Sequence, residues 1–211
     1  MMSIRYQKRD VIVLEALALR VRLLGQRQAA DAFWNGHMAN ARRRLNQLAR
    51  EGMLNRSVVN AQPMPELDQP LVRWRPGLSA PNPDEVSYRL KIRWRYRVLR
   101  PTVVYFPTAK IIEQFGGTSR PQIKIHQITH DLGVTAVWLK YAQQDLQRTE
   151  AWLGEDVLAP TRIHQKLPDA ALTDMNGNPK LIIEFGGSYG ADRVRDFHDD
   201  AVIRQLPYHL W

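Results

Sequence analysis

The 211-residue sequence contains no cysteine. A chain without cysteine cannot form disulfides, use a thiol in catalysis or bind zinc through thiolates. This absence is compatible with a reducing compartment. We therefore expect a cytoplasmic protein with a hydrophobic core, for which 44% apolar and 24% charged residues are ordinary values.

Long hydrophobic runs are absent as well. The longest, Val11–Leu19 and Leu181–Phe185, are interrupted by charge or too short to span a bilayer. The opening residues, MMSIRYQKRD, lack the apolar stretch and the small-residue cleavage site of a secretory signal. We expect no contact with a membrane.

Acidic residues are scarce in the first half of the chain. Residues 1–100 contain 19 Lys and Arg but 8 Asp and Glu, whereas residues 101–211 contain 11 and 13. The net charge of +9 and the pI of about 10.1 suit a polyanionic partner. Because solubility does not require one-sided charge, the asymmetry favours a nucleic acid over the alternative of a merely solvated basic surface.

Helical spacing predicts three helices before residue 55. The first begins with Asp10 as its N-cap, ends at Gly25 and has an apolar face of Val13, Leu14, Leu17 and Val21. A short second helix covers Gln26–Phe33. The third lies within His37–Leu54, where Gly52 suits the left-handed conformation that often follows a helix.

Two strand-like segments, Leu54–Val59 and Leu71–Arg75, follow these helices and are joined by a proline-rich loop. Three helices and a two-stranded wing are the order of a winged helix-turn-helix. The spacing Leu45-x2-Leu48-x3-Gly52-x-Leu54 resembles the passage from recognition helix to wing in winged-helix DNA-binding domains. This resemblance implies a winged helix over residues 1–80.

The polar face of the third helix supplies candidate DNA contacts. An α-helix fits the major groove of B-DNA, where its side chains reach base edges and phosphates. The candidates on this helix are Asn40, Arg42, Arg43, Arg44, Gln47 and Arg50, and those in the wing are Arg73 and Arg75. The alternative is a solvated helix face on a three-helix unit that contacts proteins.

Residues 81–105 form a basic and aromatic connector. Alternation of apolar and basic residues over 86–98 favours a strand, although Pro83-Asp84-Glu85 is a good helix start. Basic groups next to aromatic ones suit a nucleic-acid backbone, and the candidates are Lys91, Arg93, Arg95 and Arg97. Alternatively, Trp94 and Tyr96 pack between two domains.

Residues 106–211 predict an α/β or α+β domain, because strand-like and helical segments are mixed. We expect helices over Gln127–Gln147 and Asp192–Leu206. The expected strands lie within Val157–His164, Leu167–Leu172, Leu181–Phe185 and Tyr208–Trp211, with a tight hairpin turn at Asn176-Gly177.

Three carboxylates of this domain, Glu155, Asp169 and Glu184, are candidate catalytic residues. Carboxylates at strand ends can hold Mg²⁺, which activates water and stabilises charge on a phosphate. Pro168-Asp169-x14-Glu184 resembles the PD-(D/E)xK nuclease superfamily, which implies Asp169 and Glu184 as metal ligands. The lysine that the superfamily places two residues after the glutamate is replaced by Gly186.

Two arginines of the next helix, Arg193 and Arg195, are the candidate substitutes for that lysine. Arginine stays charged at physiological pH, so it could stabilise a transition state but would not act as a base. The Mg²⁺-dependent endonuclease is therefore the alternative to a degenerate, restriction-endonuclease-like domain that does not cleave DNA.

The whole chain resembles the replication-relaxation family of plasmid and mobile-element proteins. The matching features are Thr108, Phe115-Gly116-Gly117, His126, Trp152-x2-Glu155, Pro168-Asp169 and Glu184. The resemblance implies binding to double-stranded DNA during replication, mobilisation or regulation of such an element. It also suggests a homodimer, or a replication or mobilisation protein as partner. A protein-assembly module that uses the basic face without DNA is a further alternative.

Overall fold

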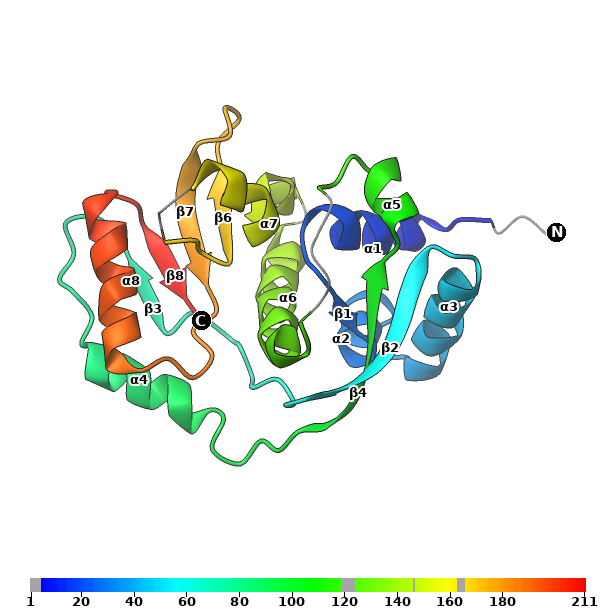
Figure 1. Cartoon of the computed structure of the whole chain (residues 1–211), viewed down its shortest axis with the longest axis horizontal. Coiled ribbons are helices and arrows are strands. Elements are labelled where there is room, and N and C mark those ends of the chain that lie inside the picture. Colours follow the sequence, from blue (N-terminus) through cyan, green and yellow to red (C-terminus); the bar gives the residue numbers. More distant parts are fainter. Residues whose placement is uncertain (1–4, 119–123, 146, 163–165) are drawn as a thin grey trace. The chain divides into compact units, whose positions relative to one another are not determined.

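The structure, a computed structural model, describes residues 5–118, 124–145, 147–162 and 166–211 (Figure 1). Within these residues the protein has a mixed α+β fold with eight α-helices and two sheets. One sheet has three antiparallel strands and the other has five mixed strands.

The chain forms two compact units, each built from two segments. Unit 1 contains residues 1–63 and 99–139, and unit 2 contains residues 64–98 and 140–211. The ranges expected from sequence, 1–80, 81–105 and 106–211, are consecutive and therefore divide the chain differently. Residues 64–98 lie in sequence between the two segments of unit 1, but they belong to unit 2.

Unit 1 is a group of helices beside the three-stranded sheet. Its elements are α1 (Lys8–Leu19), β1 (Leu24–Gly25), α2 (Gln26–Phe33), α3 (Met38–Arg50), β2 (Leu54–Ala61), β4 (Arg100–Pro107), α5 (Ala109–Gln114), a 3-10 turn (Ile125–Gln127) and α6 (Ile128–Gln144) up to Leu139. The second helix has the predicted bounds. The left-handed conformation expected at Gly52 is confirmed by its φ of +72°.

The start of α1 differs from the prediction. Gln7 is the N-cap, and the backbone N–H of Gln7 donates to the Asp10 carboxylate at 2.7 Å. Asp10 therefore lies inside the first turn and is fully buried. The helix ends at Leu19, and Gly25 is instead the N-cap of α2.

The sheet of unit 1 has the order β1-β4-β2. β2 pairs with β4 along its whole length, from Leu54 opposite Pro107 to Ala61 opposite Arg100. The predicted pairing of Leu54–Val59 with Leu71–Arg75 is therefore wrong. In Figure 1, β2 and β4 lie side by side, with α3 next to β2.

Unit 2 is built around the five-stranded sheet, whose order is β3-β8-β7-β6-β5. Its elements are β3 (Val72–Trp74), α4 (Pro83–Ile92), a 3-10 turn (Gln147–Ala151), β5 (Trp152–Gly154), α7 (Glu155–Leu158), a 3-10 turn (Ala159–Thr161), β6 (Ala170–Thr173), β7 (Pro179–Glu184), α8 (Ala191–Ile203) and β8 (Tyr208–Leu210). β7 is the central strand, as predicted. It is antiparallel to β6 and parallel to β8.

β3 lies in this sheet because its side chains complete the core of unit 2. Trp74 is buried and stacks on Tyr208 with ring centroids 5.6 Å apart. It also meets the His198 ring edge-on at 5.0 Å. These partners lie more than 100 residues away, so local sequence does not reveal them.

Residues 83–92 form a helix, so the preferred strand prediction is wrong and the helix alternative is confirmed. The Asn82 side chain accepts hydrogen bonds from the N–H groups of Asp84 and Glu85 at 3.0 and 3.3 Å. Pro83 occupies the first turn, where its missing N–H costs nothing. Val86 and Leu90 are buried in the core that α8 also joins. In Figure 1, α4 and α8 lie side by side.

Two further predictions in unit 2 need correction. In residues 140–211 the first strand is β5, whereas Glu155–Leu158 is helical and residues 163–165 lie outside the described residues. The β6–β7 connection is longer than a two-residue turn, because Asp174 and Asn178 close it with a backbone hydrogen bond of 2.9 Å. Gly177 supplies the positive φ within it.

No helix in the parts of the chain that the structure describes is long and apolar enough to cross a bilayer.

Candidate functional site

The excess positive charge of the chain belongs entirely to unit 1. Unit 1 contains 15 Lys and Arg against 6 Asp and Glu, a net charge of +9. Unit 2 contains 15 of each kind and is neutral. A polyanion would therefore be attracted mainly to unit 1.

The third helix of unit 1 presents an exposed polar face. Ala41, Leu45 and Leu48 are buried and fix the helix against the unit. The exposed candidates are Asn40, Arg42, Arg43, Gln47 and Arg50. Among the described residues, no carboxylate lies within ion-pair distance of Arg42, Arg43 or Arg50. Their charges are available to a partner.

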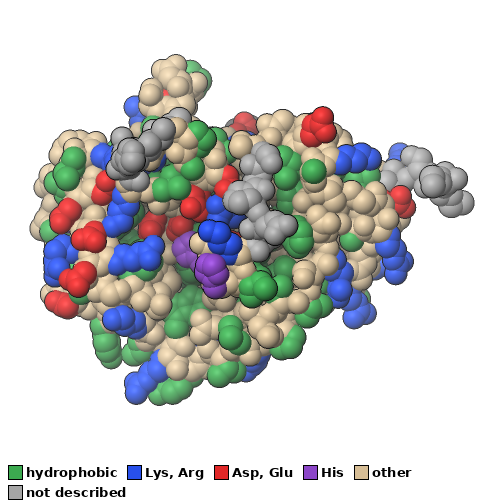
Figure 2. All heavy atoms as spheres, viewed as in Figure 1, with side chains coloured by type: hydrophobic (Ala, Val, Ile, Leu, Met, Phe, Trp, Pro, Cys, Tyr) green, Lys and Arg blue, Asp and Glu red, His purple; other side chains and the backbone are tan. Residues whose placement is uncertain are grey.

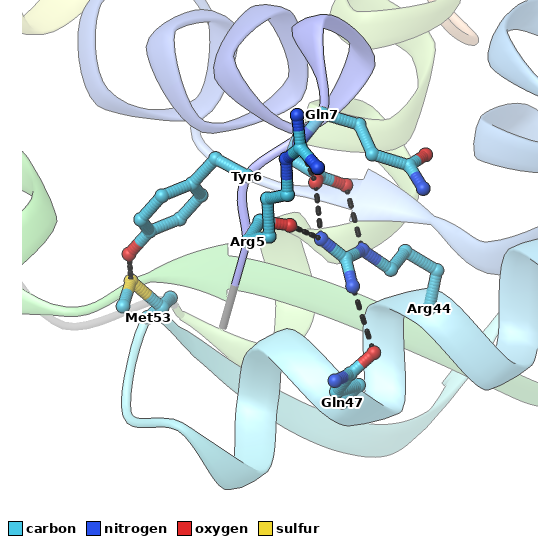
Figure 3. A network of polar contacts seen from close by, with 7 residues as sticks. Arg5, Tyr6, Gln7, Arg44, Gln47 and Met53 are labelled. Atoms are coloured by element: carbon cyan, nitrogen blue, oxygen red, sulfur yellow. Dashed lines mark hydrogen bonds and ion pairs between the residues drawn. The ribbon is translucent and has the colours of Figure 1, made fainter. Parts of the chain in front are cut away.

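Arg44 differs from its neighbours because its guanidinium is bound within unit 1 (Figure 3). It donates to both carboxylate oxygens of Asp10, at 3.0 and 2.5 Å, and to the backbone oxygen of Arg5 at 2.9 Å. A further bond of 2.8 Å reaches the side-chain oxygen of Gln47. The Arg44 side chain is 15% exposed.

This network gives Arg44 a structural role that the sequence does not predict. The hydrogen bond to Asp10 raises the pKa of the Arg44 guanidinium above its ordinary value. Because Asp10 is buried, it needs a charged partner to offset its desolvation. Arg44 thus ties α3 to the start of α1.

A pocket of about 290 Å³ lies beside this network. It is lined by Gln7 and Arg9 at the start of α1, Trp34 after α2, and Asn40, Arg43, Arg44 and Gln47 of α3. Four of these residues were candidate DNA contacts from sequence. Gln7, Arg9 and Trp34 were missed, since their positions relative to α3 depend on how the helices pack.

The remaining basic candidates lie in unit 2. Arg73 and Arg75 are exposed at β3 and not in a wing. Lys91 and Arg95 are exposed, and the Arg95 guanidinium lies 5.4 Å from the Tyr96 ring centroid. Arg73 and Arg75 therefore do not belong to the same unit as α3.

The other two candidate residues of the connector, Arg93 and Arg97, are partly buried. Arg97 donates to the backbone oxygens of Arg93 and Met64 at 2.8 and 3.1 Å. Burial lowers the pKa of Arg93. Trp94 donates to the Gly187 oxygen at 2.9 Å within unit 2, whereas Tyr96 is 83% exposed.

The carboxylates of Asp169 and Glu184 do come together, because β6 and β7 are antiparallel. The Asp169 backbone N–H donates to Glu184 Oε2 at 3.1 Å, and the Phe185 N–H donates to Asp169 Oδ2 at 2.7 Å. The Glu155 N–H donates to the Asp169 backbone oxygen at 3.0 Å. All three predicted acidic residues therefore lie at one end of the strands.

Neighbouring backbone and side-chain groups donate hydrogen bonds to these carboxylates. Glu184 is 4% exposed, and its Oε1 accepts a 2.5 Å bond from the Tyr189 hydroxyl. Burial and the charges of Glu184 and Asp169 raise the pKa of Tyr189, so it remains a donor. Tyr189 is a site residue that the sequence pattern does not indicate.

Internal hydrogen bonds engage the two carboxylates at the expected Mg²⁺ site. Magnesium requires several oxygen ligands in octahedral geometry and usually keeps bound waters. Both oxygens of Glu184 and one of Asp169 already accept internal hydrogen bonds. Within the described ranges, no group of three or more acidic or histidine residues could hold a metal ion.

Gly186, at the position of the missing lysine, is enclosed by apolar side chains. A Cβ atom there would lie 2.9 Å from Leu90 Cδ1 and 3.0 Å from Leu210 Cδ1. The same turn is held by α4, because the Ser87 hydroxyl donates to the Tyr189 oxygen at 2.9 Å. A long side chain at this position would therefore displace part of the core of unit 2.

The two arginines of α8 are exposed and engaged locally. The Arg193 guanidinium lies 3.9 Å from the Tyr189 ring centroid, and Arg195 pairs with Asp192 at 2.7 Å. Figure 2 shows acidic and basic side chains mixed over the face of unit 2 that carries α8, on the left of the view. Arg193 is therefore the nearer candidate to the carboxylates.

Comparison of this chain with protein-family models, curated proteins and solved structures finds no match.

The functional interpretation therefore depends on geometry alone. The resemblance to the replication-relaxation family remains a prediction, as do the individual DNA contacts. The observation that most limits the choice is that Arg42, Arg43 and Arg50 of α3 have no carboxylate partner among the residues that the structure describes.

Proposed function

We propose that the protein binds double-stranded DNA through unit 1, with α3 as the helix that enters the major groove. The observation that carries this proposal is the exposed face of Asn40, Arg42, Arg43, Gln47 and Arg50 on a helix anchored by buried residues. Such side chains can contact phosphates and base edges from one helix face. The net charge of +9 on unit 1 would steer it to DNA.

The order of elements in unit 1 supports a winged-helix interpretation with a different wing from the one first expected. After α3, β2 is followed by its antiparallel partner β4. β4 takes the place that the sequence pattern gave to residues 71–75. The connection between the two wing strands is then the long segment 62–99, part of which belongs to unit 2.

We further propose that unit 2 is a nuclease-like domain that does not cleave DNA. The meeting of Asp169 and Glu184 supports the likeness to the PD-(D/E)xK superfamily. The enclosure of Gly186 and the hydrogen bonds to both carboxylates favour the non-cleaving form. Replication, mobilisation or regulation of a plasmid or mobile element is the role that the family resemblance suggests.

The proposal is tested by measuring the affinity for a fluorescein-labelled duplex over about 50–200 mM salt. Arg43→Ala and Arg50→Ala should each weaken binding by about 1–3 kcal/mol if they contact bases, or reduce the salt slope by about one if they contact phosphates. Lys180→Ala, which removes one exposed charge from unit 2, is the matched control. Wild-type protein that fails to bind duplex DNA would refute the proposal.

The endonuclease alternative is favoured by one observation, the shared strand end of Asp169 and Glu184. It predicts cleavage of plasmid DNA in the presence of Mg²⁺ that Asp169→Ala abolishes. The binding and cleavage assays together distinguish a protein-assembly module from both alternatives, because such a module would neither bind nor cleave DNA.

A further inference from the structure

The pocket between the start of α1 and α3 has the composition of an anion site. Its lining contains three arginines and three amide side chains, and no acidic residue. A cation would find no charged ligand there. The lining therefore selects for a negatively charged group with several acceptor oxygens.

Two of the three arginines carry charge that nothing in the described part of unit 1 neutralises. Arg44 is paired with Asp10, so this pair adds little net charge. No carboxylate of the described residues lies within ion-pair distance of Arg9 or Arg43. The pocket thus holds about two uncompensated positive charges, enough to neutralise a DNA backbone phosphate, which carries one negative charge.

Several side chains of the pocket contact one another or a neighbouring ring. The Arg9 guanidinium lies 5.1 Å from the ring centroid of the buried Trp34. Arg43 donates to the Asn40 side-chain oxygen at 3.4 Å. Gln47 accepts from Arg44 through its oxygen, which leaves its amide NH₂ as a donor. Contacts that already restrict a side chain reduce the conformational entropy that it loses when a ligand binds.

From these observations we infer that this pocket binds a backbone phosphate of the DNA, with Arg9 and Arg43 as its charged ligands. This inference rests on the proposed function and adds the contact that would position α3 on the DNA. Asn40, Arg43 and Gln47 belong to α3, so a phosphate held here would fix the register of that helix along the duplex. Phosphate contacts set position and orientation, whereas base contacts set sequence preference.

Arg9 is the residue that separates this inference from the proposed function, because it lies outside α3. Arg9→Ala should lower the affinity for duplexes of different sequence to a similar extent and reduce the salt slope by about 0.9. Arg9→Lys keeps the charge and should restore the slope while lacking the forked hydrogen bonds. Lys180→Ala is again the control. The melting temperature of each variant shows whether it is folded.

A second measurement uses inorganic phosphate as the probe. We expect its addition to shift the side-chain Nε–Hε signals of Arg9 and Arg43 in NMR spectra, and not those of Arg27, which pairs with Asp31 outside the pocket. If Arg9→Ala binds DNA with the affinity and salt slope of the wild type, the phosphate-binding role of the pocket is wrong, whereas the proposed function is unaffected.

The opposite outcome is equally informative. If duplex DNA does not bind but phosphate shifts the Arg9 and Arg43 signals, the pocket is an anion site and the DNA-binding function fails. If neither probe binds, both proposals fail.

Discussion

Units 1 and 2 contain the same number of basic residues and differ in their acidic ones. On α3 of unit 1, Arg42, Arg43 and Arg50 are exposed, and no carboxylate in the described part of the chain pairs with them. In unit 2, Arg195 of α8 pairs with Asp192 at 2.7 Å, and Arg204 at the C-cap of α8 pairs with Asp200 at 2.9 Å. The difference in net charge between the units therefore comes from the smaller number of acidic residues in unit 1, and not from a larger number of basic residues.

This comparison also separates two kinds of arginine within one helix. Arg43 and Arg44 are adjacent in sequence, yet Arg43 is exposed and Arg44 is bound to a buried carboxylate. A run of basic residues in the sequence therefore does not by itself define a binding surface. The following predictions test this division, beginning with the largest effect.

Arg44→Ala should reduce the free energy of unfolding of unit 1 by about 3–5 kcal/mol, because it leaves the buried Asp10 carboxylate without its charged partner. Arg43→Ala, on the same helix, should change it by less than about 0.5 kcal/mol, as exposed substitutions usually do. Urea denaturation followed by circular dichroism measures both. Equal stability of the two variants would contradict the conclusion that Arg44 stabilises the fold whereas Arg43 does not.

Gly186→Ala should destabilise unit 2 by about 1–3 kcal/mol, because the added methyl group meets Leu90 and Leu210 at 2.9–3.0 Å. In a Leu90→Ala background the same change should cost less, since the shortened side chain makes room. A double-mutant cycle in urea measures this coupling. A fully stable Gly186→Ala variant would show that the position can accept a side chain, which would weaken the case against a lysine there.

The smallest effect concerns pH and unit 2. Burial lowers the pKa of His198 below its ordinary value of 6.5. The unfolded chain therefore binds the proton first as pH falls below about 6.5, and unit 2 loses stability down to the lower folded pKa. His198→Gln should lessen this loss between pH 7 and pH 5, measured by urea denaturation at each pH. An unchanged pH dependence in the variant would contradict this assignment.

The parts of the fold that sequence predicted correctly are those set by neighbours along the chain. Gln26–Phe33 has its expected bounds, and Leu181–Phe185 overlaps the central strand β7. Helical spacing works because residues three and four apart share a helix face. The helix at 83–92 follows the same logic, since its capping residues outweighed the alternation that favoured a strand.

The errors concern residues whose partners are far away in sequence. The wing was assigned to residues 71–75 because they follow β2 closely, but β4 is the partner of β2. The candidate site shows the same limit. Its α3 residues were found from helix periodicity, whereas Arg9, Trp34 and Tyr189 had no local signal.

The sequence by itself determined the amphipathic helices, the excess of positive charge and the glycine at position 186. Tertiary structure decided which unit carries that charge, which arginine of α3 is bound to Asp10, and whether position 186 has room for a longer side chain. The physical reason is that periodicity and caps act over a few residues, while strand pairing, burial and ion pairing join groups tens of residues apart.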